Sequence, residues 1–292
     1  MEALLAIIEA GIVSGSIYSL IAVGMTLLLV VADVIQFAYG QAVVISIFFC
    51  WLTLHLTNSV VLSFFVAAVV STVLQFVLEP LLRTLRERKL VLETLILTIA
   101  VGMILTEAMC QYFNAGMPIA FPDSMAGGGW ALSFRLIRIT AADLYVVVAT
   151  VASLAVLAFF LFKTRQGKTL RAMAYNIQVS RLLGIPIRKC TTLSFVVAGF
   201  LSALTAILLI LALGAASPVL GENLTFKGLA VMMLGGMGNL KGAVLGGFIL
   251  GLIEALVRGY LIGDWADAVG MGVIMFVITL KPAGLLGQVK QG

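Results

Sequence analysis

Long apolar runs separated by short polar segments repeat along the whole chain of 292 residues. A run of about 20 apolar residues is long enough to cross a bilayer as a helix, which satisfies its own backbone hydrogen bonds. The pattern predicts an all-α polytopic membrane protein with about nine transmembrane helices, within a range of eight to ten, some of them discontinuous. The first predicted span is long, and the seventh and ninth are weak. The nine predicted spans are 4–32, 35–57, 60–82, 90–113, 143–162, 191–213, 219–238, 242–260 and 267–281.

Composition supports this fold class, because hydrophobic residues make up 62% of the chain and charged residues only 11%. Soluble domains carry about 25% charged residues, so this chain lacks the charge to cover a water-facing surface. The net charge of +5 is therefore a marker of loop orientation and does not indicate nucleic-acid binding. Three well-separated cysteines and a single histidine give no metal-ligand spacing, so we expect no metal site.

Lysine and arginine gather in two loops, 83–89 and 163–190, which the positive-inside rule places in the cytoplasm. The first loop holds four of them, the second holds seven, and nine spans bring Lys241, Lys281 and Lys290 to the same side, which makes 14 of the 18. The N-terminus is then predicted to be periplasmic and the C-terminus cytoplasmic. Since no basic segment opens the chain, we expect the first span to be retained. Residues 1–292 are predicted to form a single membrane domain.

A glycine-rich stretch at 234–247 reads LGGMGNLKGAVLGG and raises the question of a phosphate site. A phosphate-binding loop needs G-x-x-x-x-G-K-[ST], but Lys241 follows a leucine and precedes a glycine, and the dinucleotide spacing fails as well. Glycines four residues apart instead lie on one helical face and allow another helix to approach closely. Gly11 and Gly15 repeat this spacing in the first span. The residues predicted to serve helix packing are Gly235, Gly236, Gly238, Gly242, Gly246, Gly247 and Gly251.

The basic loop 163–190 is longer than a simple connection. Leu170, Met173 and Ile177 are spaced by three and four residues, which predicts a short amphipathic helix on the cytoplasmic face. This segment is either a solvated basic loop or a docking helix for a cytoplasmic partner. The longest outer loop, 114–142, is predicted to carry a short interfacial helix, since Trp130 and Phe134 suit the membrane–water boundary.

Polar residues inside the predicted spans are candidates for the transport pathway, because a charge in hydrocarbon is costly. Asp33 lies at the break between the first two spans and is either a pathway residue or a helix cap. Lys227 and Glu254 lie in adjacent antiparallel spans at similar distances from the turn between them, so we expect them to pair, in a structural role more than as substrate contacts. The full set of pathway candidates is Asp33, Gln36, Tyr39, Gln41, Lys227 and Glu254.

Four stretches resemble the branched-chain amino acid ABC transporter permease family, of the LivH type, and follow one another in the family's order. They read GSIYSLIAVGMTLLLVVADVIQFAYGQ (15–41), TRQGKTLRAMAYNIQVSRLLGI (164–185), PVLGENLTFKGLAVMMLGGMGNLKGAVLGGFILGLIE (218–254) and KPAGLLG (281–287). The resemblance implies that the second stretch is the helix that couples the permease to an ATPase. The matching residues in it are Gly167, Leu170, Arg171, Ala172, Ala174, Asn176, Gly184 and Ile185.

The same resemblance implies a multi-pass subunit of the bacterial inner membrane that imports branched-chain or other hydrophobic amino acids by alternating access. Its partners would be a second, related permease (LivM type) or another copy of itself, a periplasmic substrate-binding protein and two cytoplasmic ATP-binding subunits. ATP and Mg would bind to those subunits, so this chain would be no enzyme and hold no cofactor. Where the family commonly has Asn-Phe-Ala-His-Gly-Glu, residues 36–41 read QFAYGQ. This departure leaves urea, short amides and aromatic or other carboxylic acids as alternative substrates.

Two other classes of function compete with the importer subunit. A stand-alone secondary transporter would need its own ion-coupling acids and usually an inverted repeat, and no convincing repeat is present. An intramembrane enzyme would need a nucleophile–base pair, an HExxH motif or paired catalytic aspartates, and the sequence has none of these.

Overall fold

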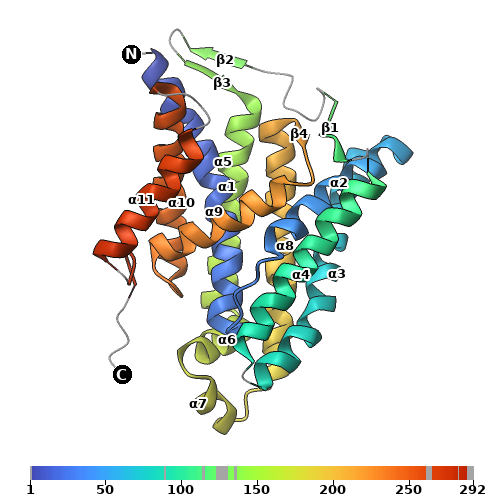
Figure 1. Ribbon diagram of the computed structural model, residues 1–292, viewed down its shortest axis with the longest axis vertical. Coiled ribbons are helices and arrows are strands. Elements are labelled where there is room, and N and C mark those ends of the chain that lie inside the picture. The colour runs from blue at the N-terminus through green and yellow to red at the C-terminus, as the bar shows by residue number, and fades with distance from the viewer. Residues whose placement is uncertain are drawn as a thin grey trace.

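The computed structural model describes residues 2–88, 90–113, 116–122, 131–134, 137–260, 265–281 and 283–287, and the chain there is almost entirely helical (Figure 1). Seven helices in this part of the chain are long and apolar enough to cross a membrane. The all-α polytopic fold predicted from the sequence is thereby confirmed. The seven helices are α1 (Glu2–Ala32), α2 (Tyr39–Thr57), α3 (Val60–Glu87), α4 (Val91–Tyr112), α5 (Ala141–Lys163), α8 (Ile187–Leu213) and α10 (Leu240–Tyr260).

Two further apolar helices, α9 (Leu220–Gly235) and α11 (Trp265–Leu280), are shorter. Each has 16 residues. At a rise of 1.5 Å per residue each extends about 24 Å, against about 30 Å for the hydrocarbon core. Each of the nine predicted spans coincides with one of these nine helices, and the two that the hydropathy pattern marks as weak are the two short ones.

The two ends of the molecule differ in secondary structure. One end carries the short helices α6 (Arg165–Tyr175) and α7 (Ile177–Leu182), close to the last turn of α3 and the first turn of α8 (Figure 1). Both basic loops therefore lie at this end, which we call the basic end. The opposite end carries the N-terminus and a hairpin of β2 (Ala131–Phe134) and β3 (Ile137–Thr140), and we call it the hairpin end.

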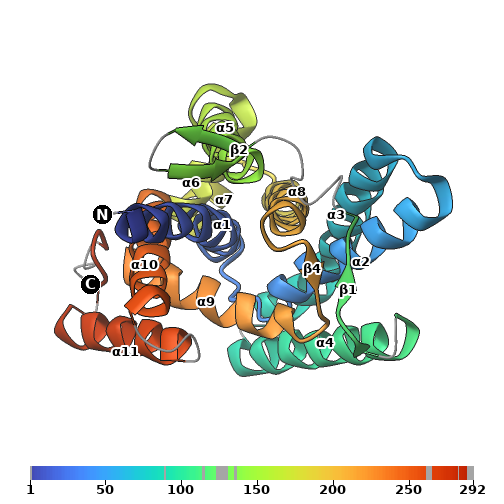
Figure 2. The same cartoon turned by 90° about the horizontal axis from the view of Figure 1, so that it is seen from above.

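Helices α1 and α8 lie at the centre of the bundle, with α5 on one face and α9, α4 and α11 on the other (Figure 2). The fully buried apolar side chains come mainly from α1, α2 and α8, among them Leu20, Phe48 and Phe195. Helices α3, α4 and α5 instead expose large apolar side chains such as Phe65, Ile96 and Phe159. Because lipid replaces water around these helices, apolar exposure needs no partner there.

The buried face of α3 is built from small and polar residues. Its buried residues are Ser63, Ala67, Ser71, Gln75, Leu78, Glu79 and Leu82, of which only Leu78 and Leu82 are large and apolar. Ser71 shares a hydroxyl–hydroxyl hydrogen bond with Ser202 of α8, and a Cβ on Gly199 of α8 would lie 2.7 Å from the Cα of Thr72. Small side chains and interhelical hydrogen bonds hold these helices together, since lipid supplies no hydrophobic drive between helices.

Helices α1 and α10 cross with their backbones in contact, as the glycine spacing predicts. A Cβ on Gly251 would collide with the backbone nitrogen of Gly15, and a Cβ on Gly247 would lie 2.7 Å from the Cα of Ser19. The hydroxyl of Ser19 donates a hydrogen bond of 2.9 Å to the carbonyl oxygen of Val244. The crossing therefore combines close packing with an interhelical hydrogen bond.

Helices α9 and α10 also pack closely through glycines, but two of the glycines predicted to serve helix packing do not lie between helices. A Cβ on Gly242 would collide with the carbonyl oxygen of Gly235, and one on Gly246 would lie 2.8 Å from the carbonyl oxygen of Val231. Gly238, however, does not lie on a helical face, because α10 begins only at residue 240, and Gly238 occupies the turn with φ 92°. Gly236 also has a positive φ, 105°, and packs against residues 284 and 287 rather than against a helix.

The segment 283–287 closes the α9–α10 turn. The amides of Leu285 and Leu286 donate to the carbonyl oxygens of Leu234 and Gly235, at 2.8 and 3.1 Å. Asn239 caps α10 by accepting from the amides of residues 241 and 242, and its side-chain nitrogen donates to the carbonyl oxygen of Leu286. Two free carbonyls at the end of α9 are thus satisfied by residues 51 positions further along the chain.

Two helices, α2 and α9, begin after a non-helical link that brings their first residues together, whereas the discontinuity predicted within some spans stays a prediction. Residues 33–38 link α1 to α2, and residues 214–219 link α8 to α9. The second link contains β4 (Ala215–Ala216), which pairs antiparallel with β1 (Ile119–Ala120) of the long outer loop. The two links bring the first residues of α2 and α9 together, since a Cβ on Gly40 would collide with the carbonyl oxygen of Gly221.

The interfacial helix predicted for 114–142 is wrong in the part of this loop that the structure describes. Phe134 belongs to the hairpin of β2 and β3, in which it pairs with Ile137, and the loop's first described segment forms β1. Trp130 lies outside the described residues. The described strands of this loop are held by antiparallel backbone pairing and not by helical hydrogen bonds.

Candidate functional site

Lys227 and Glu254 form the intramembrane pair that the sequence predicts. The Nζ atom of Lys227 lies 3.0 Å from Oε2 of Glu254, and the two residues are 7% and 1% exposed. The hydroxyl of Tyr18 donates to the same carboxylate oxygen at 2.7 Å and accepts from Lys227 at 3.0 Å. The pair therefore joins α9 and α10 to α1 through one buried triangle of hydrogen bonds.

Two more charges complete this network, and sequence reasoning missed both. Lys227 also donates to Asp267 of α11 at 2.9 Å, and Arg258 donates to Glu254 at 3.2 Å. Arg258 lies 3.7 Å from Asp267. Arg258 could have been found from its position one helical turn after Glu254, but nothing in the local sequence marks Asp267. Two cations and two anions balance each other, which supports a structural role in holding α11 to the core.

The link between α1 and α2 and the first turn of α2 together hold four of the predicted pathway residues. Asp33 is exposed, has a positive φ of 52° and bonds through its amide to the carbonyl oxygen of Leu29, so its backbone caps α1. The side-chain nitrogen of Gln36 donates to the side-chain oxygen of Gln75 at 2.9 Å. The hydroxyl of Tyr39 donates to the carbonyl oxygen of Ala198 at 3.0 Å. The Gln75 side chain of α3 and a backbone carbonyl of α8 thus fix this link and the start of α2.

The start of α2 also binds the start of α9. Thr225 accepts a hydrogen bond of 3.0 Å from the amide of Gly40 and lies 3.4 Å from the side-chain oxygen of Gln41. Of the six pathway candidates, the five other than Asp33 are buried within this chain, each at most 7% exposed. Their positions indicate contacts between helices of one subunit more than an open surface for a substrate.

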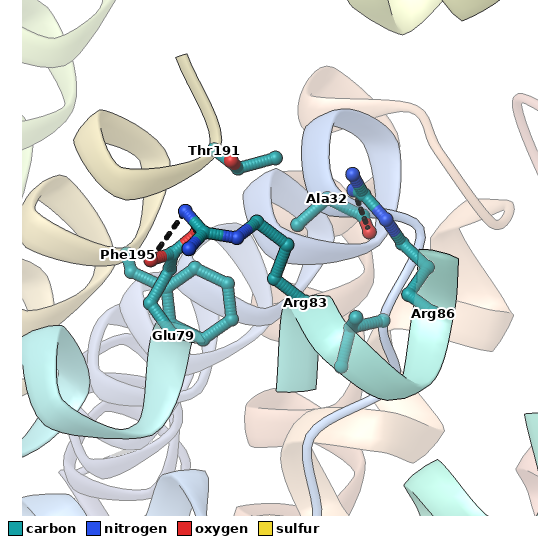
Figure 3. A pocket seen from close by; sticks show the side chains of 7 residues that line it. Ala32, Glu79, Arg83, Arg86, Thr191 and Phe195 are labelled. Atoms are coloured by element: carbon teal, nitrogen blue, oxygen red, sulfur yellow. Dashed lines mark hydrogen bonds and ion pairs between the residues drawn. The ribbon is translucent and has the colours of Figure 1, made fainter. Parts of the chain in front are cut away.

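A small pocket at the basic end joins α1, α3 and α8 (Figure 3). In it Arg83 points toward Glu79, with 3.3 Å between Nη1 and Oε1, while Arg86 donates from Nη1 to the carbonyl oxygen of Ala32 at 2.6 Å. Ala32 is the last residue of α1, so Arg86 satisfies one of the carbonyls that a helix end leaves free. Arg86, a basic residue of the first loop, therefore fixes the end of α1.

The predicted amphipathic segment is present as α6 and α7. Thr164 caps α6 by accepting from the amide of Gly167, and a Cβ on Gly167 would collide with the carbonyl oxygen of Phe160. Leu170 and Met173 are 0% and 3% exposed. Arg171 donates from Nε to the carbonyl oxygen of Leu161 at 3.0 Å, and its guanidinium lies 4.7 Å from the ring centroid of Phe162. Helix α6 is thus packed tightly onto the end of α5.

The remaining coupling candidates lie at the end of α6, at the cap of α7 and in the turn that follows α7. Asn176 caps α7, since its side-chain oxygen accepts from the amides of residues 178 and 179. Gly184 has φ 75° and turns the chain back toward α8, while Ala172, Ala174 and Ile185 are partly exposed. Sequence reasoning missed the most exposed apolar side chains of α6, α7 and the turn after α7, which are Tyr175, Val179, Leu182 and Leu183.

Comparison with known proteins places the chain among transport permeases. Residues 7–279 match the sequence profile of the family described as branched-chain amino acid transport system, permease component. LivH of Escherichia coli K12, a high-affinity branched-chain amino acid transport system permease protein, is 27% identical over 292 residues, which cover 95% of this chain and 94% of the relative. BraD of Pseudomonas aeruginosa is 28% identical over 291 residues with the same coverage. No solved structure matches the chain.

Proposed function

This chain belongs to the family of branched-chain amino acid transport permease components, and from this premise we propose that it is the permease subunit of a binding-protein-dependent importer. Its cargo would be branched-chain or other hydrophobic amino acids, as the names of LivH and BraD suggest. Substrate would cross by alternating access at the interface with a second permease of the LivM type or with another copy of this chain. Separate ATPase subunits, which hold ATP and Mg, would drive the cycle.

The observation that carries this proposal is the apolar surface on α6 and α7. Tyr175, Leu182 and Leu183 are 89%, 87% and 73% exposed on a segment that also carries arginines and lysines. Lipid does not account for these exposed apolar side chains, because basic loops at the end of a bundle lie in the cytoplasm. A groove on a cytoplasmic ATPase would bury these side chains.

The attachment of α6 to α5 supports a role in coupling. Gly167 packs against backbone atoms of Phe160 and Leu161, so α6 and the end of α5 have no flexible side chain between them. The bond from Arg171 to the carbonyl oxygen of Leu161 adds a second link. A displacement imposed on α6 by an ATPase would therefore move α5 with it.

The orientation that we propose for the protein in the membrane follows from the basic residues at the end that carries α6 and α7. The basic end would face the cytoplasm, which places the C-terminus inside and the N-terminus in the periplasm of a bacterial inner membrane. The hairpin end would then receive the periplasmic binding protein. The distribution of lysine and arginine between the two ends supports this assignment.

The test is uptake by the reconstituted assembly. The chain, its partner permease and the ATPases are placed in liposomes with the cognate binding protein and radioactive leucine, and ATP-dependent uptake is measured. The variant Leu182→Asp should abolish binding of the ATPase, while Gln178→Asp adds the same charge to the start of α7 and should leave it intact. Leucine uptake by this chain alone, without ATPase subunits, would refute the proposal in favour of a stand-alone transporter.

A further inference from the structure

Helix α9 starts within the membrane layer. Its first turn touches the first turn of α2 through Gly40 and Gly221. Gly40 lies about 25 Å along the axis of α2 from the last residue of that helix, Thr57, at 1.5 Å per residue. Tyr39, which precedes Gly40, reaches the interior of α1, since a Cβ on Gly24 would collide with the Tyr39 hydroxyl and Gly24 lies about 12 Å before the end of that helix at Ala32. Residues of the first turn of α9 therefore lie below the membrane surface.

One stripe of α9 is not covered by this chain. Glu222, Asn223 and Phe226 are exposed, and Leu229 and Met233 continue the same stripe at partial exposure. The opposite side of α9 is buried against α1, α2 and α10. In Figures 1 and 2 this helix lies between α11 and α4, on the face of the molecule turned away from α5. The uncovered stripe thus has two polar residues at the start of the helix and apolar residues after them.

Glu222 has no neutralising partner in the part of the chain that the structure describes, where every ion pair of α9 is made by Lys227. Lys227 is itself committed to Glu254 and Asp267, on the buried side of the helix. Glu222 lies in the first turn of α9, where the helix dipole stabilises an acid only weakly. That stabilisation is less than the cost of a carboxylate against lipid, so this side chain requires a cation from outside the chain or a wet surface. Ionisable residues in this position are functional candidates for that reason.

We propose that the Glu222 carboxylate receives the ammonium group of the amino acid as it passes along α9. Phe226 follows one turn later on the same stripe and, with Leu229, offers an apolar surface to the side chain of the substrate. Asn223 supplies a further hydrogen-bonding group beside the carboxylate. This arrangement fits a cationic amine joined to an apolar side chain, whereas urea, amides and carboxylic acids carry no cation for Glu222. The inference rests on the proposed importer function and names the part of the substrate that the pathway recognises.

The experiment uses the complete transporter in liposomes, with leucine-loaded binding protein as the probe. Glu222→Gln should lower leucine uptake about tenfold or more, as expected for the loss of a hydrogen bond to a charged group. Glu222→Asp, which keeps the charge, should recover part of that loss. The matched control is Glu107→Gln, because Glu107 is an exposed carboxylate of α4 that already accepts a 2.8 Å hydrogen bond from Gln111, and its uptake should remain within about twofold of wild type.

Two further measurements separate the outcomes. Glu222→Gln should still copurify with the partner permease and should still hydrolyse ATP when the loaded binding protein is added. Uptake equal to wild type in Glu222→Gln would overturn the inference, and so would a failure to assemble, which would assign the carboxylate to a cation of the partner permease. A wild-type transporter that imports no amino acid would overturn the proposed function itself.

Discussion

The Nζ atom of Lys227 lies 3.0 Å from Oε2 of Glu254, and both groups are buried between α9 and α10. Removing one partner of such a pair leaves a charge uncompensated, whereas removing both together does not. Lys227→Met should therefore destabilise the protein by about 3 kcal/mol, because Glu254 and Asp267 lose one of their two shared cations and keep only Arg258. The measurement is thermal unfolding of the purified protein in detergent.

The control for this prediction is the double variant Lys227→Met with Glu254→Gln, which leaves Arg258 and Asp267 as a balanced pair. It should be more stable than Lys227→Met alone. Equal stability of the single and double variants would show that charge balance does not hold this network together.

The crossing of α1 and α10 is expected to be intolerant of a single methyl group. Gly251→Ala places a Cβ against the backbone of Gly15, where no flexible side chain can move aside. We expect a loss of about 1–3 kcal/mol, as for overpacking in a well-packed core. Gly272→Ala is the matched control, since a Cβ there meets nothing within 4 Å and alanine favours a helix. A melting temperature for Gly251→Ala at or above that of Gly272→Ala would contradict the prediction.

The junction of α2 and α9 is expected to be equally sensitive. Gly40→Ala would drive a Cβ into the carbonyl oxygen of Gly221 and would disturb the hydrogen bond between its own amide and Thr225. Gly102→Ala meets the Gln41 amide only at ordinary contact distances from 3.5 Å and serves as the control. Uptake in liposomes should fall by about tenfold or more for Gly40→Ala, consistent with a shift of about 1.4 kcal/mol or more, and stay near wild type for Gly102→Ala. Comparable uptake by both variants would rule out a tight α2–α9 contact.

Coupling through α6 can be tested with a bulky acid at Ala172, a partly exposed residue between the buried Leu170 and Met173. Ala172→Glu should break the link between ATP hydrolysis and uptake or prevent assembly with the ATPase. Gln166→Glu adds an acid to the exposed first turn of the same helix, where the helix dipole tolerates it, and should have little effect. The measurement is the number of leucine molecules imported per ATP hydrolysed, and an unchanged ratio in fully assembled Ala172→Glu would exclude this role.

Hydropathy by itself predicted the nine apolar helices of this protein, because the bilayer requires each span to be apolar over a contiguous stretch of sequence. The two spans that the pattern marks as weak, at 219–238 and 267–281, are the two that form short helices. Distance along the chain was also enough to predict the pair of Lys227 and Glu254. Both flank one tight turn, and two antiparallel helices bring residues at equal distances from a turn to the same depth.

The tertiary structure alone decided which faces meet. Asp267 joins the buried charges from a separate helix, and Gly238 lies in a turn although its spacing matches the packing glycines. Five of the six predicted pathway residues are covered by this chain, while Glu222, which no sequence pattern marks, is uncovered. Within a membrane, a polar residue type indicates that the side chain is shielded from lipid, but it does not indicate which neighbour shields it. That choice depends on helix rotation and on where α2 and α9 begin, and those are set by contacts between segments far apart in the sequence.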